Sequence, residues 1–369
     1  MKAGFHKPDY TLIIIAAIIV AYGLIMLSSA SNVVSFEKFG DSNYLLKHQL
    51  LYGLGLGLLI FLVTAKLDYH VWRKFAFPLL GLNILLLLAV FLPGIGYEYG
   101  GARRWISFGP TLLQPTEVLK LTFILYLSTL FAKNREGIKD PAYGLVPFLI
   151  ISGVIVFLIM LQPDMGTMVV IALVGLIIFF LAGAPWKHLA WLVAGAAGLF
   201  FLLIKIAPYR AARLTVFLNP ALDPQGVGYH INQALLAIGS GGIFGLGYGH
   251  SRQKFLYLPE VTGDSIFAVI AEELGLIFSV ALVLLFLAVL YRGYRIAKAA
   301  PDTYGRLLAA GIVSWLVLQA FINIAAMVTL IPLTGIPLPF VSYGSSALVT
   351  SLAAIGILIN ISKQTKERV

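Results

Sequence analysis

Cysteine is absent from all 369 residues of the sequence. This absence excludes disulfide bonds, zinc sites built on thiolates and iron–sulfur clusters, but it indicates nothing about the compartment in which the protein works. A metal site would need carboxylates or some of the six histidines, and no two histidines have the HExxH spacing of zinc hydrolases.

Charged residues are scarce as well. Asp, Glu, Lys and Arg make up 11% of the chain, whereas 60% of the residues are hydrophobic and the mean hydropathy is +0.93. Soluble domains carry about 25% charged residues, so most of this chain's surface is expected to face lipid. The net charge of +10 is typical of cytoplasmic loops beside anionic lipid and does not indicate a nucleic-acid partner.

Long apolar runs make up most of the sequence. A membrane-spanning helix needs about 20 consecutive, mostly apolar residues. Ten segments qualify: 10–30, 47–65, 74–93, 117–133, 143–162, 165–184, 188–207, 264–291, 306–331 and 342–361. The fifth and sixth are separated by Gln162-Pro163-Asp164, which predicts a tight hairpin rather than one kinked helix. The first has no small-residue cleavage site and is too long for a signal peptide. The sequence predicts an all-α polytopic membrane protein, with one ten-span domain over residues 1–369.

The distribution of Lys and Arg predicts the orientation. With the N-terminus inside, the inner loops hold about twice as many of these residues as the outer loops, so both termini are predicted to be cytoplasmic. Residues 208–263 then form a long outer loop between the seventh and eighth spans. Its apolar runs, 234–238 and 255–258, predict short re-entrant or interfacial helices that pack on the bundle.

Acidic residues inside or next to predicted spans are candidates for function, because each costs about 2.5–3.5 kcal/mol to insert. Asp264 precedes the eighth span, where it fits either a helix cap or a partly desolvated base, and the residues alone favour neither. Glu272 and Glu273 point about 100° apart on a helix, and we predict that at least one forms a buried ion pair. Asp164 is also predicted to pair with a base.

Basic residues gather after the third span. Arg103 and Arg104 suit lipid phosphates, including a pyrophosphate, although anchoring at the membrane surface is the simpler interpretation. Lys120 follows Glu117 by three residues, which predicts an intrahelical ion pair.

Three prolines between residues 332 and 339 break any helix before the tenth span. The small hydroxylated residues that follow, among them Ser342 and Ser345, fit helix packing or the wall of a polar cavity.

Seven short motifs follow one another along nearly the whole chain: GARRWI (101–106), QPTE (114–117), QPDMGT (162–167), GSGG (239–242), LPE (258–260), DSIFAVIAEELG (264–275) and PLPFVSYG (337–344). In this order they resemble the SEDS family of peptidoglycan glycosyltransferases. Ser251-Arg252-Gln253-Lys254-Phe255 is similar to the division branch of that family, which is FtsW-like.

The chain departs from the family pattern close to Asp264. Thr262, Gly263 and Ser265 stand where the family usually has His, Thr and Phe, while the aspartate keeps its spacing. A second departure is at Gly344, where the family often has one more glycine before the serines.

The resemblance implies polymerisation of lipid II at the outer face of the bacterial cytoplasmic membrane, with Asp264 as the catalytic base. It further implies a divalent cation, Mg²⁺ or Mn²⁺, and a class B penicillin-binding protein as partner, beside membrane lipids. The residues that we expect to bind the substrate are Arg103, Arg104, Glu117, Lys120, Glu260, Ser342 and Ser345. Asp164, Glu272 and Glu273 are expected to be structural.

Two other functions fit a bundle of this kind. A lipid II flippase would also need intramembrane carboxylates and helices broken by proline, but the hydropathy shows no inverted repeat and the ionisable residues gather in the outer half. A scaffold for a transpeptidase would not need the charged residues at the outer face.

Overall fold

The computed structural model describes residues 6–99, 101–134, 136–206, 214–219, 222–223 and 226–365. Each of the ten predicted spans corresponds to a helical segment in these ranges. They are α1 (Tyr10–Ala30), α3 (Tyr44–His48) with the π-helical η1 (Gln49–Gly55) and α4 (Leu56–Lys66), α5 (Tyr69–Ala89), α6 (Pro115–Lys133), α7 (Leu145–Leu161), α8 (Met165–Leu181), α9 (Trp186–Ile206), α12 (Ile266–Ala299), α13 (Thr303–Met327) and α14 (Ser345–Ser362).

The chain is a multi-pass membrane protein. Within the described part, seven helices are long and apolar enough to cross a membrane, and α7 and α8 are shorter apolar helices. α7 ends at Leu161 and α8 begins at Met165, so the predicted hairpin is confirmed. The break before the tenth span is confirmed too, because α13 ends at Met327 and α14 begins at Ser345.

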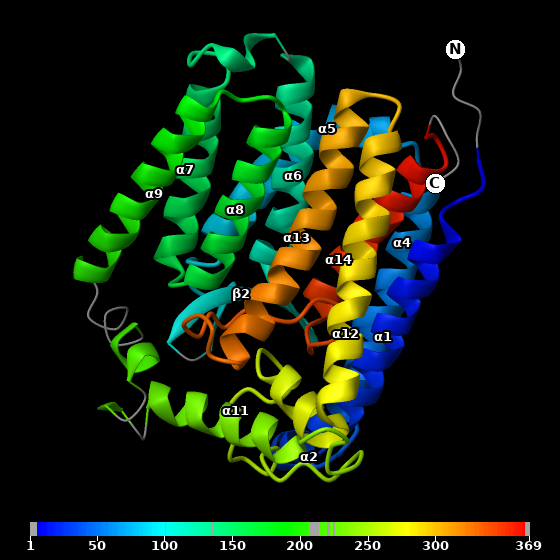
Figure 1. Ribbon diagram of the computed structural model, residues 1–369, viewed down its shortest axis with the longest axis vertical. Coiled ribbons are helices and arrows are strands. Elements are labelled where there is room, and N and C mark those ends of the chain that lie inside the picture. Colours follow the sequence, from blue (N-terminus) through cyan, green and yellow to red (C-terminus); the bar gives the residue numbers. More distant parts are fainter. Residues whose placement is uncertain are drawn as a thin grey trace.

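Helices α13 and α14 lie at the centre of the bundle (Figure 1). α13 packs against α6, α8 and α12, and α14 packs against α4. The buried apolar side chains form a contiguous core that reaches from α1 to α14. The two ends of the described part of the chain lie at the same end of the bundle, where the backbone N–H of His6 donates to the carbonyl of Lys363 at 2.8 Å. Whether that end is cytoplasmic stays a prediction.

The opposite end of the bundle, called the outer end below, carries shorter elements. α2 (Asn32–Phe39) follows α1, and α11 (Val227–Gly241) lies across this end, within the predicted 208–263 loop (Figure 1). The rest of that loop is only partly within the described residues. α11 covers the first apolar run of the loop, 234–238, whereas the second run, 255–258, forms turns instead of the predicted short helix. That α11 is re-entrant or interfacial stays a prediction.

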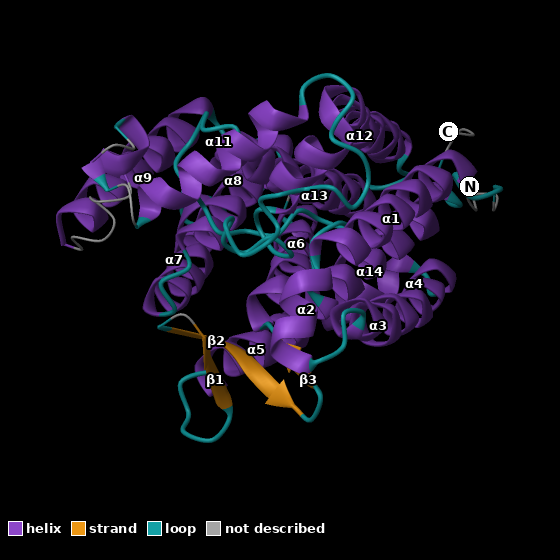
Figure 2. Ribbon diagram, turned by 90° about the horizontal axis from the view of Figure 1, so that it is seen from below, coloured by secondary structure: helices purple, strands orange, loops and turns teal. Residues whose placement is uncertain are grey.

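A small antiparallel sheet at the outer end was not predicted. It is formed by β1 (Gly96–Tyr99), β2 (Ala102–Phe108) and β3 (Thr111–Leu113), in the order β1-β2-β3. Figure 2 shows it at the edge of the bundle beside α5. The chain is therefore mostly, not entirely, helical, because the outer loop between α5 and α6 folds back on itself instead of continuing a helix.

Helix α12 is broken near its start. Gly275 has φ 74° and ψ −171°, which separates a short segment, 266–274, from the long span that follows. Residues 242–247 pair with the backbone groups that this break exposes: Leu276 N–H donates to the Gly242 carbonyl at 2.9 Å, and Leu246 N–H donates to the Glu272 carbonyl at 2.9 Å. Glycine suits this position because it adopts positive φ without strain. We call residues 266–274 the short segment of α12.

Candidate functional site

Asp264 lies in the turn that leads into the short segment of α12. In this turn the N–H groups of Gly263 and Ser265 both donate to the carbonyl of Glu260, at 2.9 and 3.2 Å. The turn delays the helix, so the N-cap position belongs to Ser265. The interpretation of Asp264 as the helix cap is therefore wrong, and the carboxylate is left at the open, partly exposed outer end.

Three neighbours hold the backbone of this turn. The carbonyls of residues 262, 263 and 264 accept hydrogen bonds from Tyr343 N–H (2.8 Å), Ser342 Oγ (2.6 Å) and Asn323 Nδ2 (2.8 Å), respectively. Ser342, predicted to bind substrate, is buried and thus positions the turn. These three hydrogen bonds hold the backbone on both sides of the Asp264 side chain.

The proline-rich segment 332–339 forms one side of the site. Asn323 also donates to the Ile336 carbonyl at 2.8 Å, and Gln319 donates to the Pro337 carbonyl at 2.9 Å. Gly335 has φ 69° and faces the catalytic candidate, since a Cβ there would lie 3.9 Å from Asp264 Oδ2. α13 therefore holds both the turn and this segment.

Glu117 and Lys120 form the predicted intrahelical pair. The Lys120 Nζ lies 2.7 Å from Glu117 Oε1, and both side chains are at most 3% exposed. The same ammonium donates to Gln319 Oε1 at 2.7 Å and lies 5.4 Å from the centroid of the Trp315 ring. Lys120 thus reaches the site through Gln319 rather than by facing the outer surface.

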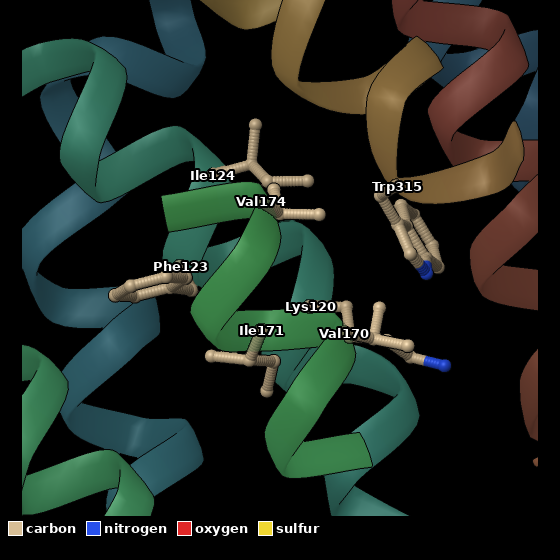
Figure 3. A pocket seen from close by; sticks show the side chains of 7 residues that line it. All are labelled: Lys120, Phe123, Ile124, Val170, Ile171, Val174 and Trp315. Atoms are coloured by element: carbon tan, nitrogen blue, oxygen red, sulfur yellow. The ribbon is translucent and has the colours of Figure 1, made fainter. Parts of the chain in front are cut away.

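Figure 3 shows the apolar surroundings of this ammonium. A small pocket between α6, α8 and α13 is lined by Lys120, Phe123, Ile124, Val170, Ile171, Val174 and Trp315. The Lys120 side chain extends along it toward the α13 side, near the Trp315 ring (Figure 3). A charge in such surroundings is tolerated because it is paired and hydrogen-bonded.

The two predicted arginines differ in role. Arg104 donates through Nε to the Gln162 carbonyl at 2.9 Å and through an Nη to the Pro163 carbonyl at 2.6 Å, so it fastens β2 to the α7–α8 hairpin. Arg103 pairs with Glu98 at 3.0 Å across the β1–β2 ladder, with 48% of its side chain exposed. Arg103 is therefore the arginine whose head group is open to a ligand.

Glu272 and Glu273 anchor the short segment of α12 to the loop before it. Glu273 forms the predicted ion pair with Lys254, at 2.8 Å and with both side chains buried. Glu272 accepts instead from the Ser251 hydroxyl and from the Arg252 N–H at 2.9 Å. Two adjacent carboxylates thus bind one turn of chain, 251–254, whose other end leads to Asp264.

Three predicted residues remain, namely Asp164, Glu260 and Ser345. Asp164 caps α8 by accepting from the N–H and the hydroxyl of Thr167, at 3.0 and 2.8 Å. The expected ion pair of Asp164 is thus replaced by a cap, because the residue falls at a helix start. Glu260 is exposed on the same turn as Asp264. Ser345 lies 3.4 Å from Nδ1 of His48 at the start of α14.

Metal ligands do not converge anywhere in the described residues. No group of three or more His, Asp or Glu side chains there is arranged to hold a metal ion. The described residues therefore do not fit a protein-built metal cage.

Sequence reasoning missed Gln319 and Asn323. Both are polar side chains four residues apart within a predicted span, and the rule that singled out the acidic residues of the spans applies to them as well. The structure thus has a partly exposed carboxylate, Asp264, in a turn that is held by its backbone, and a partly exposed arginine, Arg103, in the small sheet. Such a carboxylate can take a proton from a hydroxyl group.

Known proteins match this chain over nearly its full length. A model of the cell cycle protein family FtsW/RodA/SpoVE matches residues 9–367. The chain is 43% identical over 361 residues to stage V sporulation protein E of Bacillus subtilis, with 98% of each chain covered. It is 39% identical over 370 residues to the probable peptidoglycan glycosyltransferase FtsW of Trichlorobacter lovleyi, with 99% of this chain and 96% of the relative covered.

Solved structures agree in fold. One matching chain belongs to a peptidoglycan synthase complex, whose structure is described as showing the structural coordination of polymerization and crosslinking. It has a TM-score of 0.79 and 29% identity, with 96% of this chain and 97% of that chain covered. The crystal structure of the Thermus thermophilus rod shape determining protein RodA has a TM-score of 0.70 and 31% identity, with 97% of both chains covered.

Proposed function

The chain belongs to the FtsW/RodA/SpoVE family of cell cycle proteins, and from that membership we propose that it is a peptidoglycan glycosyltransferase that polymerises lipid II into glycan strands. Relatives across the full length carry the name peptidoglycan glycosyltransferase. The observation that carries the proposal is the position of Asp264, a carboxylate at the outer end whose turn is fixed by three neighbouring hydrogen bonds.

The reaction needs a base and a way to stabilise the leaving group. The donor sugar carries a lipid pyrophosphate at its anomeric carbon, and the acceptor is the 4-hydroxyl of a second sugar. Asp264 takes the hydroxyl proton while the oxygen attacks the anomeric carbon. The bond from that carbon to the phosphate oxygen breaks, and its electron pair leaves with the pyrophosphate.

Arg103 is the residue that we assign to the departing pyrophosphate. Its guanidinium is half exposed, whereas that of Arg104 is engaged with two carbonyls. A guanidinium binds phosphate oxygens through paired N–H donors. Glu117 and Lys120 then support the site from within the bundle, and Glu260 and Ser345 stay predicted substrate contacts.

Mg²⁺ or Mn²⁺ stays a prediction. Because the described residues provide no metal cage, such a cation would come with the pyrophosphate oxygens and its own waters, as Mg²⁺ commonly does.

The proposed setting is the bacterial cytoplasmic membrane, with the outer end facing the cell wall and both termini in the cytoplasm. A class B penicillin-binding protein, which crosslinks the new strands, is the proposed partner. Cell division is the proposed process. The structural relative from a peptidoglycan synthase complex supports a partner of this kind.

The test is polymerisation of labelled lipid II by the purified chain, with and without the partner. Asp264→Asn keeps the shape of the side chain but removes the base, and a positioned base contributes about 10²- to 10⁴-fold to a rate. We expect glycan ladders from the wild type and a loss of that size from the variant. Asp140→Asn, in the exposed loop after α6, is the matched control and should polymerise normally.

Full activity of Asp264→Asn would refute the assignment of the base. If the wild type gave no ladders even with the partner present, the polymerase proposal would fail. A flippase assay with the same lipid would then separate a transporter from a scaffold.

A further inference from the structure

His230 is a histidine on α11 that the mechanism above does not use. Its Nε2 lies 2.7 Å from the Oγ of Ser265, and that Oγ lies 3.4 Å from Asp264 Oδ1. Ser265 is fully buried and His230 is partly buried. A chain of polar contacts thus runs from the helix across the outer end to the catalytic carboxylate.

The Ser265 hydroxyl does not perform the usual task of its position. Serine at an N-cap normally accepts a hydrogen bond from a backbone N–H of the first helical turn. Here Ser265 occupies the N-cap of α12, yet its side chain makes no such bond and turns to His230 and Asp264 instead. Ser265 also stands where the family pattern has a phenylalanine, so this hydroxyl departs from the pattern.

The donor in each contact between His230, Ser265 and Asp264 can be assigned from the hydrogens that each group has to donate. An ionised carboxylate only accepts, so the single hydrogen of Ser265 Oγ goes to Asp264 Oδ1. We assign the contact of 2.7 Å between Ser265 and His230 as an Nε2–H donation from the imidazole, which leaves the Ser265 hydrogen for Asp264. The 3.4 Å contact is long, as catalytic hydrogen bonds often are before substrate binds.

We infer that His230 is a positioning residue for glycosyl transfer, acting on Asp264 through the hydroxyl of Ser265. This inference rests on the proposed function. The donated hydrogen bond fixes the rotation of the carboxylate and directs Oδ2, the atom next to Gly335, to the acceptor hydroxyl. The hydroxyl proton goes to Oδ2, and Oδ1 stays bound to Ser265 throughout.

The test is a double-mutant cycle on steady-state polymerisation. His230→Leu removes the donor, Ser265→Ala removes the hydroxyl, and His230→Gln keeps an N–H donor of similar reach. Both His230→Leu and Ser265→Ala weaken or remove a hydrogen bond to a charged group. Each should therefore lower kcat by about tenfold to a hundredfold and leave KM unchanged. The double variant should lose no more than either single one, and His230→Gln should recover most of the rate.

His250→Leu is the matched control. This histidine lies exposed in the same outer loop, where its Nδ1 contacts the carbonyl of Tyr248 at 3.0 Å. It should leave kcat unchanged. A kcat of His230→Leu equal to that of the wild type, or losses that multiply in the double variant, would overturn the inference.

A measurement without substrate separates this inference from the proposed function. The ¹⁵N NMR signals of the His230 imidazole should report an Nε2–H tautomer and should shift in both Ser265→Ala and Asp264→Ala. Signals that are the same in all three proteins would overturn the inference even where polymerisation is confirmed. Shifts in both variants without polymerisation by the wild type would show that the contacts between His230, Ser265 and Asp264 exist, while the proposed function fails.

Discussion

The ion pair between Lys254 and Glu273 is the feature whose removal should affect the protein most. The ammonium has three hydrogens and uses all of them: it donates to Glu273 Oε1, Ser29 Oγ and the Gly249 carbonyl, each at 2.8 Å. The side chains are 5% and 0% exposed. This pair joins α1, the loop after α11 and the short segment of α12, which starts beside Asp264.

The expected loss of stability follows from the burial of both side chains. Lys254→Met leaves the carboxylate without its counter-charge, and Glu273→Gln leaves the ammonium facing an amide. Removing one partner of a buried pair costs about 3–5 kcal/mol. When both are replaced, no unpaired charge remains, so the double variant should recover a coupling energy of about 1–3 kcal/mol relative to the sum of the single losses.

The assay is equilibrium unfolding of the purified protein in detergent, followed by tryptophan fluorescence, with lipid II polymerisation measured on the same samples. Lys47→Met is the control. Lys47 and Asp41 form a pair of the same 2.8 Å length, but their side chains are 68% and 41% exposed. Hydrogen bonds from the Lys47 side chain and the Asn43 N–H lower the pKa of Asp41, so this pair is charged at neutral pH. Exposed pairs contribute little, and this variant should unfold like the wild type.

Two results would refute the reasoning. If Lys254→Met unfolded like the Lys47 control, burial would not set the strength of the pair. If the losses of the single variants simply added in the double variant, the two charges would not be coupled. We also expect polymerisation to fall with stability, because the pair holds the segment that follows Asp264.

Two further changes test the backbone around the site. Asn323→Ala removes the amide that donates to the carbonyls of Asp264 and Ile336. A buried carbonyl that loses its donor, such as that of Ile336, costs about 1–3 kcal/mol, so both the unfolding free energy and polymerisation should fall. Unchanged polymerisation would show that these bonds do not place the carboxylate. Gly275→Ala puts a Cβ 2.3 Å from the backbone N of Gly245 at φ 74°, so it should cost about 3 kcal/mol or more. Its control, Gly81→Ala in α5, meets nothing within 4 Å and should be neutral or slightly stabilising in the same unfolding measurement.

The spans could be predicted because a bilayer leaves a chain few options. Apolar runs of about 20 residues must form helices there, since each backbone group has to be satisfied internally. The hairpin at residues 162–164 and the break at 332–339 were equally readable, because proline and short polar residues disrupt helices locally. The intrahelical pair of Glu117 and Lys120 needed only helix geometry.

Features that depend on long-range contacts could not be predicted from the sequence. Gly275 looks like any glycine in an apolar run, and the helix break there depends on residues 242–247, about 30 positions earlier. The strands β1 to β3 are three to seven residues long and carry no clean alternation. His230 meets Ser265 only because α11 folds across the outer end.

Two of the buried ion pairs among the described residues, Glu117–Lys120 and Lys254–Glu273, are each linked to the surroundings of Asp264 by a short path. Lys120 reaches the segment 332–339 through Gln319, and the Lys254–Glu273 pair fixes the short segment of α12. A buried pair is often no more stabilising than apolar side chains of equal volume, so net stability does not explain why charges are placed here. Each pair has a single geometry in which its donors are satisfied. We therefore expect the charges to fix the positions of the two backbone segments that meet at Asp264.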